Sequence, residues 1–467
     1  MPPSPSLDRR LTAFDAAAII VSNVIGGGIL FTPPQVAAAV PAAIPFLLVW
    51  AAGGLLAFAG AMAYAELAAL RPRAGGEYVY LRDAFGPLPA FLTGWTSFVA
   101  GFSGAIATSA IVMASYLGRF LPAAGDATPF ATLTIVPGLL VLRASPQAVV
   151  AIVAAAGMAW IHVRGVGPGR LVGDVLAVLK VAALVLFVAL GFTIGRGTLA
   201  HVTAPGHASV GGWLVALIPV MFTYSGWNAA SYVAEEIRDP GRNVPRAFAL
   251  GTLAVVLLYL LLNALYLYVL PVGALAQVRG SMLDVVADRL FGPTAGNVMA
   301  VVSVVSLLAS ISAMTFAGPR VYFAMARDGI FFGRAADVHD RYRTPAVAIV
   351  AQTVWTALLI LSATADALVN YTGFAIVLFS GWAVVSLFVL RAKAPGAPRP
   401  FRVWGYPVVP AIFIAASAAM LVDGLWREPG PTGAGLAIIA AGVPLYALFR
   451  SRRGDHGAGE HGSHEET

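Results

Sequence analysis

The sequence contains no cysteine and few charged residues. The absence of cysteine excludes structural disulfides, thiolate metal sites, a cysteine nucleophile and a disulfide-linked partner subunit. Charged residues make up only 11% of the 467 residues, against about 25% in a typical soluble protein. So few charges cannot cover the surface of a soluble protein of this length, whereas apolar residues reach 59%.

Apolar runs recur from end to end, and runs of about 20 residues are long enough to cross a bilayer as helices. We predict an all-α polytopic membrane protein with 12 transmembrane helices. The first run follows a polar, proline-rich stretch without a signal-peptide pattern, so we predict that this run is retained as a span. The predicted spans are 14–40, 44–70, 86–121, 145–163, 170–195, 211–237, 246–270, 293–326, 345–362, 365–391, 405–425 and 432–450.

The formal net charge is +7, but its distribution follows membrane topology. The arginines lie in short loops between apolar runs, with no basic stripe interleaved with aromatics, so we expect a lipid bilayer and no nucleic acid as partner. Most of the 29 lysines and arginines fall on the side that holds both termini. The positive-inside rule therefore predicts that both termini are cytoplasmic, including a disordered tail over 451–467.

The first span contains three consecutive glycines, Gly26, Gly27 and Gly28. Glycine is a poor helix former, and three in a row do not give the spacing of a small-residue packing face. Backbone groups freed by unwinding are tolerated in a membrane only where they line a cavity or are buried in protein. We predict that this helix unwinds at the glycines.

The sixth span offers a second interruption at residues 222–228, Phe-Thr-Tyr-Ser-Gly-Trp-Asn, with Pro219 just before it. Interrupted segments at matching positions of two repeats indicate a transporter binding site. Helix N-termini there would direct free amides at a carboxylate, and helix C-termini would offer carbonyls to an ammonium group. Two such breaks together would therefore bind both charged groups of a zwitterion.

Lys180 is one of two lysines in the chain and the only one within a predicted span. It lies about 15 Å along the helix from Arg170, too deep for easy snorkelling toward the cytoplasm. An ionisable group at this depth is a functional candidate, and a lysine can lose its proton when desolvated, whereas an arginine cannot. We predict that its ammonium takes the place of a coupling cation and bridges the fifth span to the unwound part of the first.

Other polar and charged residues give weaker evidence of a function. Glu66, Glu235 and Glu236 are expected to pair with nearby arginines in structural roles. No phosphate loop, zinc spacing or nucleophile elbow is present, and the histidines of the C-terminal tail are expected to be solvated. We expect no cofactor, no metal and no enzymatic activity.

Several motifs together resemble the amino acid–polyamine–organocation (APC) superfamily, and within it the L-amino acid transporter branch. Residues 25–29 are similar to an I-G-S-G-I signature, with Gly27 in place of serine, and residues 222–228 resemble the family's sixth span. The likeness extends over roughly 10–450. The other matching stretches are 75–82, 84–87, 235–240, 242–245 and 325–329.

The resemblance implies a LeuT-like fold of two inverted five-helix repeats with two extra helices. The implied domains are a cytoplasmic N-terminal segment (1–13), a first repeat (14–195), a second repeat (211–391), two additional helices (405–450) and the tail (451–467).

The resemblance also implies the residues of the site. The amides around Gly27 and Gly28 would bind the substrate carboxylate, and carbonyls near Ile25, Phe222 and Ser225 the amine, with Phe222 as gating aromatic. Lys180 would contact the first glycine of the signature. The predicted substrate-binding residues are Ile25, Gly26, Gly27, Gly28, Phe222, Ser225, Trp227 and Asn228, and the predicted coupling residues are Lys180, Gly26, Ser310 and Ser312.

Two departures from the family pattern affect this prediction. Gly27 removes a side-chain donor, and our matching places Met314 where the family often has a small hydroxyl residue that contacts the lysine, with Ser310 and Ser312 nearby. Ser225 supplies no acid for a cationic side chain, which favours neutral substrates.

We predict sodium-independent transport of neutral L-amino acids across a prokaryotic inner membrane by alternating access, as an exchanger or proton-coupled symporter, by a monomer or weak homo-oligomer. The alternatives are a cationic amino acid or polyamine transporter and a membrane-embedded amino acid sensor.

Overall fold

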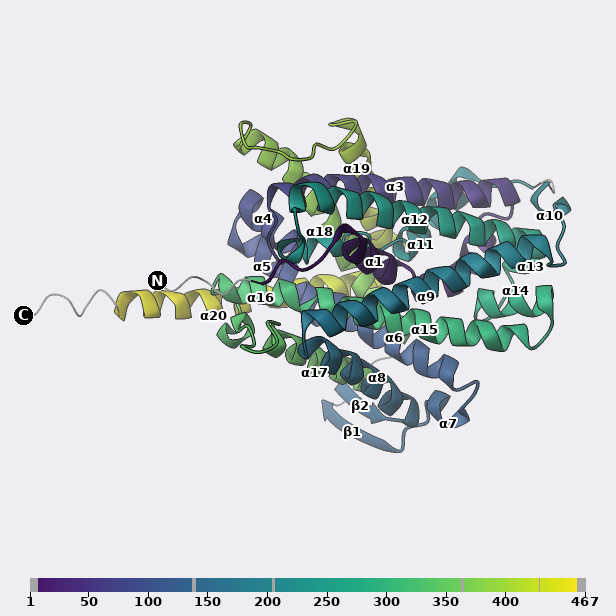
Figure 1. Cartoon of the computed structure of the whole chain (residues 1–467), viewed down its shortest axis with the longest axis horizontal. Helices are drawn as coiled ribbons and strands as arrows, with labels where there is room; N and C mark the ends of the chain where they lie inside the picture. Colours follow the sequence, from purple (N-terminus) through teal and green to yellow (C-terminus); the bar gives the residue numbers. More distant parts are fainter. Residues whose placement is uncertain (1–6, 137–139, 204–205, 363–364, 428, 460–467) are drawn as a thin grey trace, which may run out of the picture.

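The computed structural model describes residues 7–136, 140–203, 206–362, 365–427 and 429–459 (Figure 1). Nine helical stretches in this part of the chain are long and apolar enough to cross a membrane, a bent pair forms a further candidate, and two shorter apolar helices match the predicted sixth and ninth spans. Helix therefore occupies every predicted span. The continuous stretches are α3 (Ala43–Leu70), α5 (Pro87–Thr96) to η1 (Ser97–Gly101) and α6 (Phe102–Leu117), α8 (Pro146–Val163), α9 (Val166–Thr193), α12 (Pro240–Val269), α15 (Ala295–Ala317) with α16 (Pro319–Arg327), α17 (Ala346–Ser362), α18 (Ala365–Lys393), α19 (Val408–Arg427) and α20 (Pro429–Gly459).

Both predicted interruptions are present. The first span consists of α1 (Ala13–Val24) and α2 (Gly27–Ala39), which meet at an angle of 48°. In the sixth span, α11 (Val210–Thr223) ends in turns, and the chain continues through the short 3-10 helices η2 (Ala229–Ser231) and η3 (Ala234–Glu236). The predicted span 211–237 is therefore α-helical only in its first half, up to the predicted interruption at 222–228.

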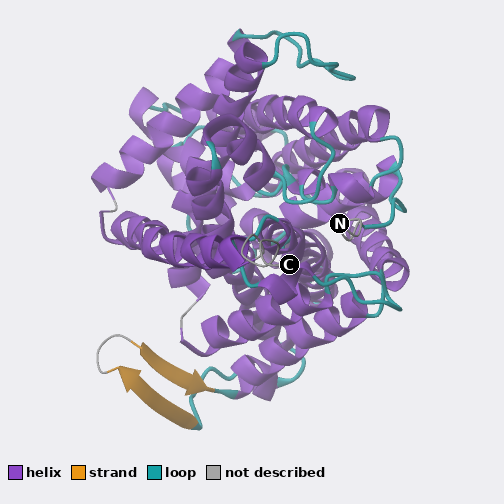
Figure 2. Cartoon of the chain, turned by 90° about the vertical axis from the view of Figure 1, so that its left-hand side faces the viewer, coloured by secondary structure: helices purple, strands orange, loops and turns teal. Residues whose placement is uncertain are grey.

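Short elements connect the spans. The predicted loop between the third and fourth spans contains an antiparallel hairpin of β1 (Ala131–Val136) and β2 (Leu140–Ala144), in which Ala131 pairs with Ala144 (Figure 2). Its threonine, isoleucine and valine residues favour extended backbone, a signal that the search for apolar runs does not detect. The short helices are α4 (Glu77–Phe85), α7 (Pro122–Gly125), α10 (Ala200–Thr203), α13 (Val272–Leu275), α14 (Met282–Phe291) and η4 (Gly333–Ala336).

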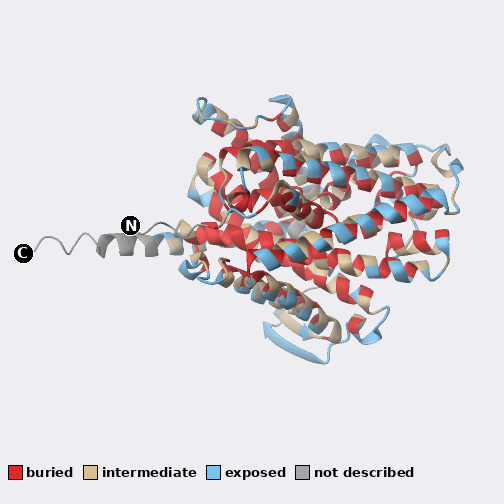
Figure 3. Ribbon diagram, viewed as in Figure 1, coloured by how far each residue is buried: buried red, intermediate tan, exposed pale blue. Residues whose placement is uncertain are grey.

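The broken helices lie among other helices and not at the edge of the molecule. α1 packs against α9, α12 and α15, and α11 packs against α2 and α3. The outer helices expose large apolar side chains such as Leu55, Leu171 and Trp426 (Figure 3). An apolar surface of this kind is suited to lipid, so buried polar groups near α1 and α11 are the ones that need a functional explanation.

The N-terminal segment is tied to the chain that follows the sixth span. The N–H groups of Arg10 and Leu11 donate to the carbonyl of Glu236, and the N–H of Arg238 donates to the carbonyl of Leu11. Leu11 is fully buried. The first described residues and the end of α20 lie on the same side of the helices (Figure 1), as expected for an even number of spans. α20 extends to Gly459 and so includes the first part of the predicted tail (451–467), whose remainder lies outside the described residues.

Candidate functional site

The break in the first span exposes unpaired backbone at two helix ends. Because α2 begins at Gly27, its first-turn N–H groups have no carbonyl partners within the helix. These donors carry the partial positive charge of a helix N-terminus. Gly26, Gly27 and Gly28 are partly exposed, although Ile25 and Ile29 on either side are buried. The helix N-terminus therefore lies where the sequence predicted a carboxylate site, and the binding of substrate there stays a prediction.

The three glycines face different surroundings. A Cβ atom added at Gly27 would meet nothing within 4 Å, whereas at Gly28 it would come within 2.9 Å of the Thr223 Cα atom. At Gly26 it would lie 3.3 Å from Ser310 Oγ. Gly28 therefore allows α2 to approach the end of α11, Gly26 allows α15 to approach, and Gly27 borders open space.

Lys180 closes the other side of the break. Its side chain is fully buried, and its Nζ atom donates to the carbonyl oxygens of Ser22, at 3.2 Å, and Ile25, at 2.5 Å. These carbonyls belong to the C-terminal end of α1, where the helix dipole favours a cation. The predicted bridge between the fifth span and the unwound backbone is present. The contact is with the carbonyl of Ile25, the residue before the first glycine.

Ser310 is the partner of Lys180 on α15. Its Oγ atom lies 3.3 Å from Lys180 Nζ and also within hydrogen-bonding distance of the Ser22 and Ile25 carbonyls. Placing Met314 at the hydroxyl position was therefore wrong by one helical turn, since Ser310 lies four residues earlier. Ser312 does not join this cluster, because its Oγ atom lies 2.9 Å from His162 Nε2.

In the sixth span, Phe222 and Ser225 lie where α11 ends. Both are partly exposed, and the N–H of Ser225 donates to the carbonyl of Phe222 at 3.0 Å. Gly226 has φ +101°, and an added Cβ would lie 3.0 Å from the backbone of Asn23 in α1. This residue thus brings the two breaks into direct contact.

Tyr259 of α12 connects the two breaks, and the sequence analysis missed it. Its hydroxyl lies 2.9 Å from the carbonyl oxygen of Val24 at the end of α1 and 3.4 Å from that of Thr223 at the end of α11. The side chain is fully buried. A tyrosine within an apolar span carries no sequence signal that separates this role from packing.

Trp227 and Asn228 are directed elsewhere. The Trp227 ring packs against Tyr64 and Phe413, with ring centroids 4.9 and 5.5 Å apart. Asn228 donates to Glu77 Oε1 at 2.6 Å. Their contact with substrate stays a prediction, since none of these contacts involves the glycines.

Glu77, also missed by the sequence analysis, is buried at the start of α4, outside the membrane-spanning helices. Besides Asn228, it accepts hydrogen bonds from the hydroxyls of Tyr64 at 2.7 Å and Tyr232 at 3.1 Å. Burial raises the pKa of this carboxyl group, and the three hydrogen bonds oppose that effect in part. The segment after α11 is therefore tied to the connection between α3 and α4.

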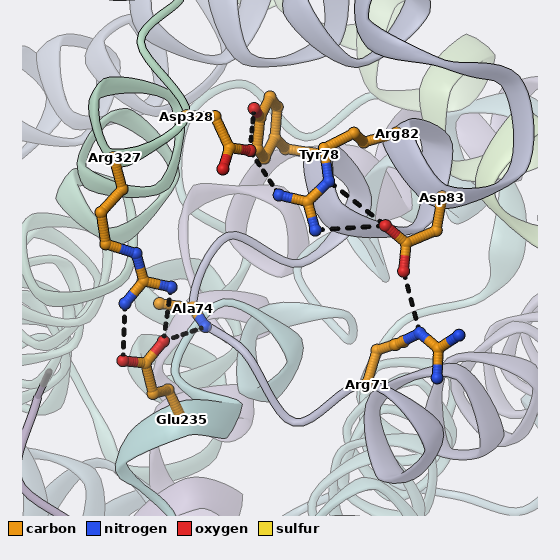
Figure 4. A network of polar contacts seen from close by, with 8 residues as sticks. All are labelled: Arg71, Ala74, Tyr78, Arg82, Asp83, Glu235, Arg327 and Asp328. Atoms are coloured by element: carbon orange, nitrogen blue, oxygen red, sulfur yellow. Dashed lines mark hydrogen bonds and ion pairs between the residues drawn. The ribbon is translucent and has the colours of Figure 1, made fainter. Parts of the chain in front are cut away.

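Ion pairs join the connections on the side of the termini (Figure 4). Arg327 binds Glu235 at 2.9 Å, and Glu235 also accepts from the N–H of Ala74; Arg82 pairs with Asp328. The predicted pairing of the acidic residues is confirmed. Glu236 also pairs with Arg320, both fully buried, and Glu66 pairs with Arg391 and Arg399.

Two interrupted helices, one of them bound at its break by a buried amine, are typical of a secondary transporter. A profile of the amino acid permease family matches residues 11–449, and the chain belongs to that family.

Relatives match along most of their length. The human large neutral amino acids transporter small subunit 2 is 30% identical over 453 residues, covering 95% of this chain and 81% of the relative. The mouse b(0,+)-type amino acid transporter 1 is 28% identical over 453 residues, covering 95% and 88%. The mouse Asc-type amino acid transporter 1 is 28% identical over 451 residues, covering 95% and 81%.

These matches confirm the resemblance to the L-amino acid transporter branch of the APC superfamily and the LeuT-like fold class. The chain is a multi-pass membrane protein of an amino acid transporter family, and the prediction that it is not an enzyme is confirmed.

Proposed function

We propose that this protein transports neutral L-amino acids without sodium, by alternating access around the breaks in the first and sixth spans. The observation that carries the proposal is the position of Lys180. Its amine lies on the carbonyls of Ser22 and Ile25, where half-helix C-termini coordinate a cation in transporters of this kind. A fixed amine there supplies the positive charge that sodium would otherwise bring.

The free amides of α2 fit the substrate carboxylate, and the carbonyls at the end of α11 fit its amine. Gly27 and Phe222 border this position, and Ser225 offers no negative charge to a cationic side chain. The name of the human relative, which specifies large neutral amino acids, supports the same substrate class.

The assembly and orientation are part of the proposal. Two relatives of the same name are called small subunits, but this chain has no cysteine with which to form a disulfide to a larger one. We infer that it works without a disulfide-linked heavy chain, as a monomer or weak homo-oligomer, in a prokaryotic inner membrane with both termini in the cytoplasm. The proposed repeats are 14–195 and 211–391.

Uptake by reconstituted proteoliposomes tests the proposal. The panel contains labelled L-alanine, L-leucine, L-phenylalanine, L-arginine and putrescine, in sodium and in choline buffers. We expect uptake of the neutral amino acids at equal rates in both buffers. Uptake limited to arginine or putrescine would contradict the substrate class, and a sodium requirement would contradict the role of Lys180.

A further inference from the structure

The start of α12 carries two exposed arginines, Arg242 and Arg246. They are four residues apart and therefore share one face of the helix. Among the described residues, neither guanidinium has an ion-pair or hydrogen-bond partner. Other arginines at this end of the helices, such as Arg320, Arg327 and Arg391, are paired with glutamates. Within the described part of the chain, two positive charges are thus left here without a counter-ion.

The same face of α12 continues as a strip of leucines. Each leucine lies at helical spacing from Arg246, within about 60° of it around the helix axis, and each side chain is 46–61% exposed. Exposed apolar side chains on a membrane-spanning helix contact lipid tails. This face therefore offers charge at its end and apolar surface along its length, which matches the two parts of a phospholipid. The strip consists of Leu250, Leu253, Leu257 and Leu261.

A third arginine comes from the connection between α18 and α19. A Cβ atom added at Gly241 would lie 2.9 Å from Pro400 Cβ, so this connection touches the start of α12. Arg402 follows Pro400 by two residues, at most about 7 Å of chain, and Arg242 is next to Gly241. Arg402 is exposed, and within the described ranges its side chain has no polar partner. The three arginines are therefore neighbours on one surface.

The position of Arg402 is fixed by the residues around it. The next residue, Val403, is buried, and its N–H donates to the carboxylate of the fully buried Glu66 at 2.7 Å. Glu66 is itself paired with two other arginines, so its charge is already compensated. Asp239, just before α12, is exposed and is the acidic residue next to this surface in the sequence. Three arginines against one such carboxylate leave a net positive charge.

Exposed aromatic side chains lie in the same connection. Trp404 is 63% exposed, and Tyr406 is 36% exposed. The Tyr406 ring is supported by Arg391, whose Cζ atom lies 3.7 Å from the ring centroid, and Phe401 packs against Trp404 with ring centroids 6.1 Å apart. Tryptophan and tyrosine are enriched at the level of the lipid headgroups. These two rings indicate that the connection lies at this level of the membrane.

We propose that Arg242, Arg246 and Arg402 bind the phosphate group of an anionic phospholipid, whose acyl chains lie along the leucine strip of α12. Guanidinium groups bind phosphate through charge-assisted and bidentate hydrogen bonds, and basic residues near a leaflet surface attract anionic lipids. A soluble phosphate compound would use the arginines alone, whereas the leucine strip and Trp404 fit a molecule that has both a headgroup and tails. This lipid site goes beyond the proposed transport function.

The test measures lipid binding directly and does not depend on transport. Purified full-length protein in detergent is titrated with fluorescent phosphatidylglycerol, and separately with phosphatidylcholine that carries the same chains and label. We expect phosphatidylglycerol to bind about tenfold more tightly, since only this lipid has a net negative charge. An excess of glycerol phosphate, which lacks the tails, should not displace the bound lipid.

Replacement by glutamine removes the charge of an arginine and keeps a polar side chain. One arginine near the leaflet surface contributes about fivefold to lipid affinity. The double variant Arg242→Gln with Arg246→Gln should therefore bind phosphatidylglycerol about 30-fold more weakly, and Arg402→Gln about fivefold more weakly. Arg334→Gln is the matched control, because Arg334 is also exposed but lies in η4, away from the leucine strip, and its loss should leave binding unchanged.

Equal binding of the two lipids by wild-type protein would overturn the proposal, and so would an equal loss in Arg334→Gln and in the double variant. Displacement by glycerol phosphate would show a site for soluble phosphate and would overturn the assignment to a lipid. All the changed side chains are exposed, so the variants should fold. If the double variant does not, Arg402→Gln decides alone, and an affinity equal to that of Arg334→Gln would overturn the site. A failure of amino acid uptake would contradict only the proposed function.

Discussion

The breaks in the first and sixth spans both interrupt a helix, but they are held by groups of opposite charge. At the first, the buried amine of Lys180 binds backbone carbonyls at the end of α1. At the sixth, the buried carboxyl of Glu77 binds the side chains of Asn228 and Tyr232. The amine holds main chain next to the glycines, whereas the carboxyl holds side chains beyond the break. Lys180 should therefore fix the main chain next to the glycines, whereas Glu77 should fix the segment that follows the second break.

The largest expected effect is at the contact between the breaks. Gly28→Val should abolish substrate binding, because even a Cβ there would lie 2.9 Å from the backbone of Thr223. Gly27→Ser is the matched control, since the same atom at Gly27 meets nothing within 4 Å. Equilibrium binding of labelled amino acid to purified protein measures both, and retained affinity in Gly28→Val would count against a site at the first break.

Removal of the amine should have the next largest effect. Lys180→Ala deletes charged hydrogen bonds to two carbonyls, and one such bond is worth about 2 kcal/mol, or about 30-fold in an equilibrium. We therefore expect the uptake rate per protein molecule to fall by about 30-fold. Lys393→Ala, a change at the other lysine of the chain, should leave uptake near the wild-type value. Normal uptake by Lys180→Ala would show that the amine is not needed for coupling.

Ser310 and Ser312 sharpen the assignment around the amine. Ser310→Ala removes one of the hydrogen bonds of the Lys180 amine, worth about 1.5 kcal/mol at the lower end for a charged donor, so uptake should fall about tenfold. Ser312→Ala leaves the contacts of Lys180 unchanged, and we expect a smaller loss of uptake. The two variants are compared at matched expression, and equal losses would contradict a specific role for Ser310.

The smallest expected effect is a pH dependence at the second break. Because burial raises the pKa of Glu77, its neutral form stabilises the folded protein below the unfolded pKa of about 4.3, and this contribution is lost as pH rises through the folded pKa. Glu77→Gln cannot titrate. The melting temperature of wild type minus that of Glu77→Gln should thus fall by about 2 °C between pH 4.5 and 8. A constant difference would mean that Glu77 does not titrate there.

Much of the fold could be predicted because a bilayer requires long apolar segments and makes their interruption costly. Glycine triplets and a lone lysine are visible against such a background, so Gly26 to Gly28 and Lys180 were found. The interruption of the sixth span was also found, but the sequence did not show that the chain beyond it continues as turns and 3-10 helix.

The partners of these residues could not be predicted, because they come from distant helices. Ser310 and Met314 are one turn apart, and only the packing of α15 against α1 decides which faces Lys180. Glu77 lies in a charged connection that resembles an ordinary loop, and Tyr259 resembles any aromatic of a span.

The hydroxyl of Tyr259 has a mechanical consequence for the cycle. The hydroxyl contacts the end of α1 and the end of α11, so a movement of either half-helix must move the other or break one of these contacts. Because both contacts come from one residue of α12, we expect the two half-helices to move together in a single step and not independently.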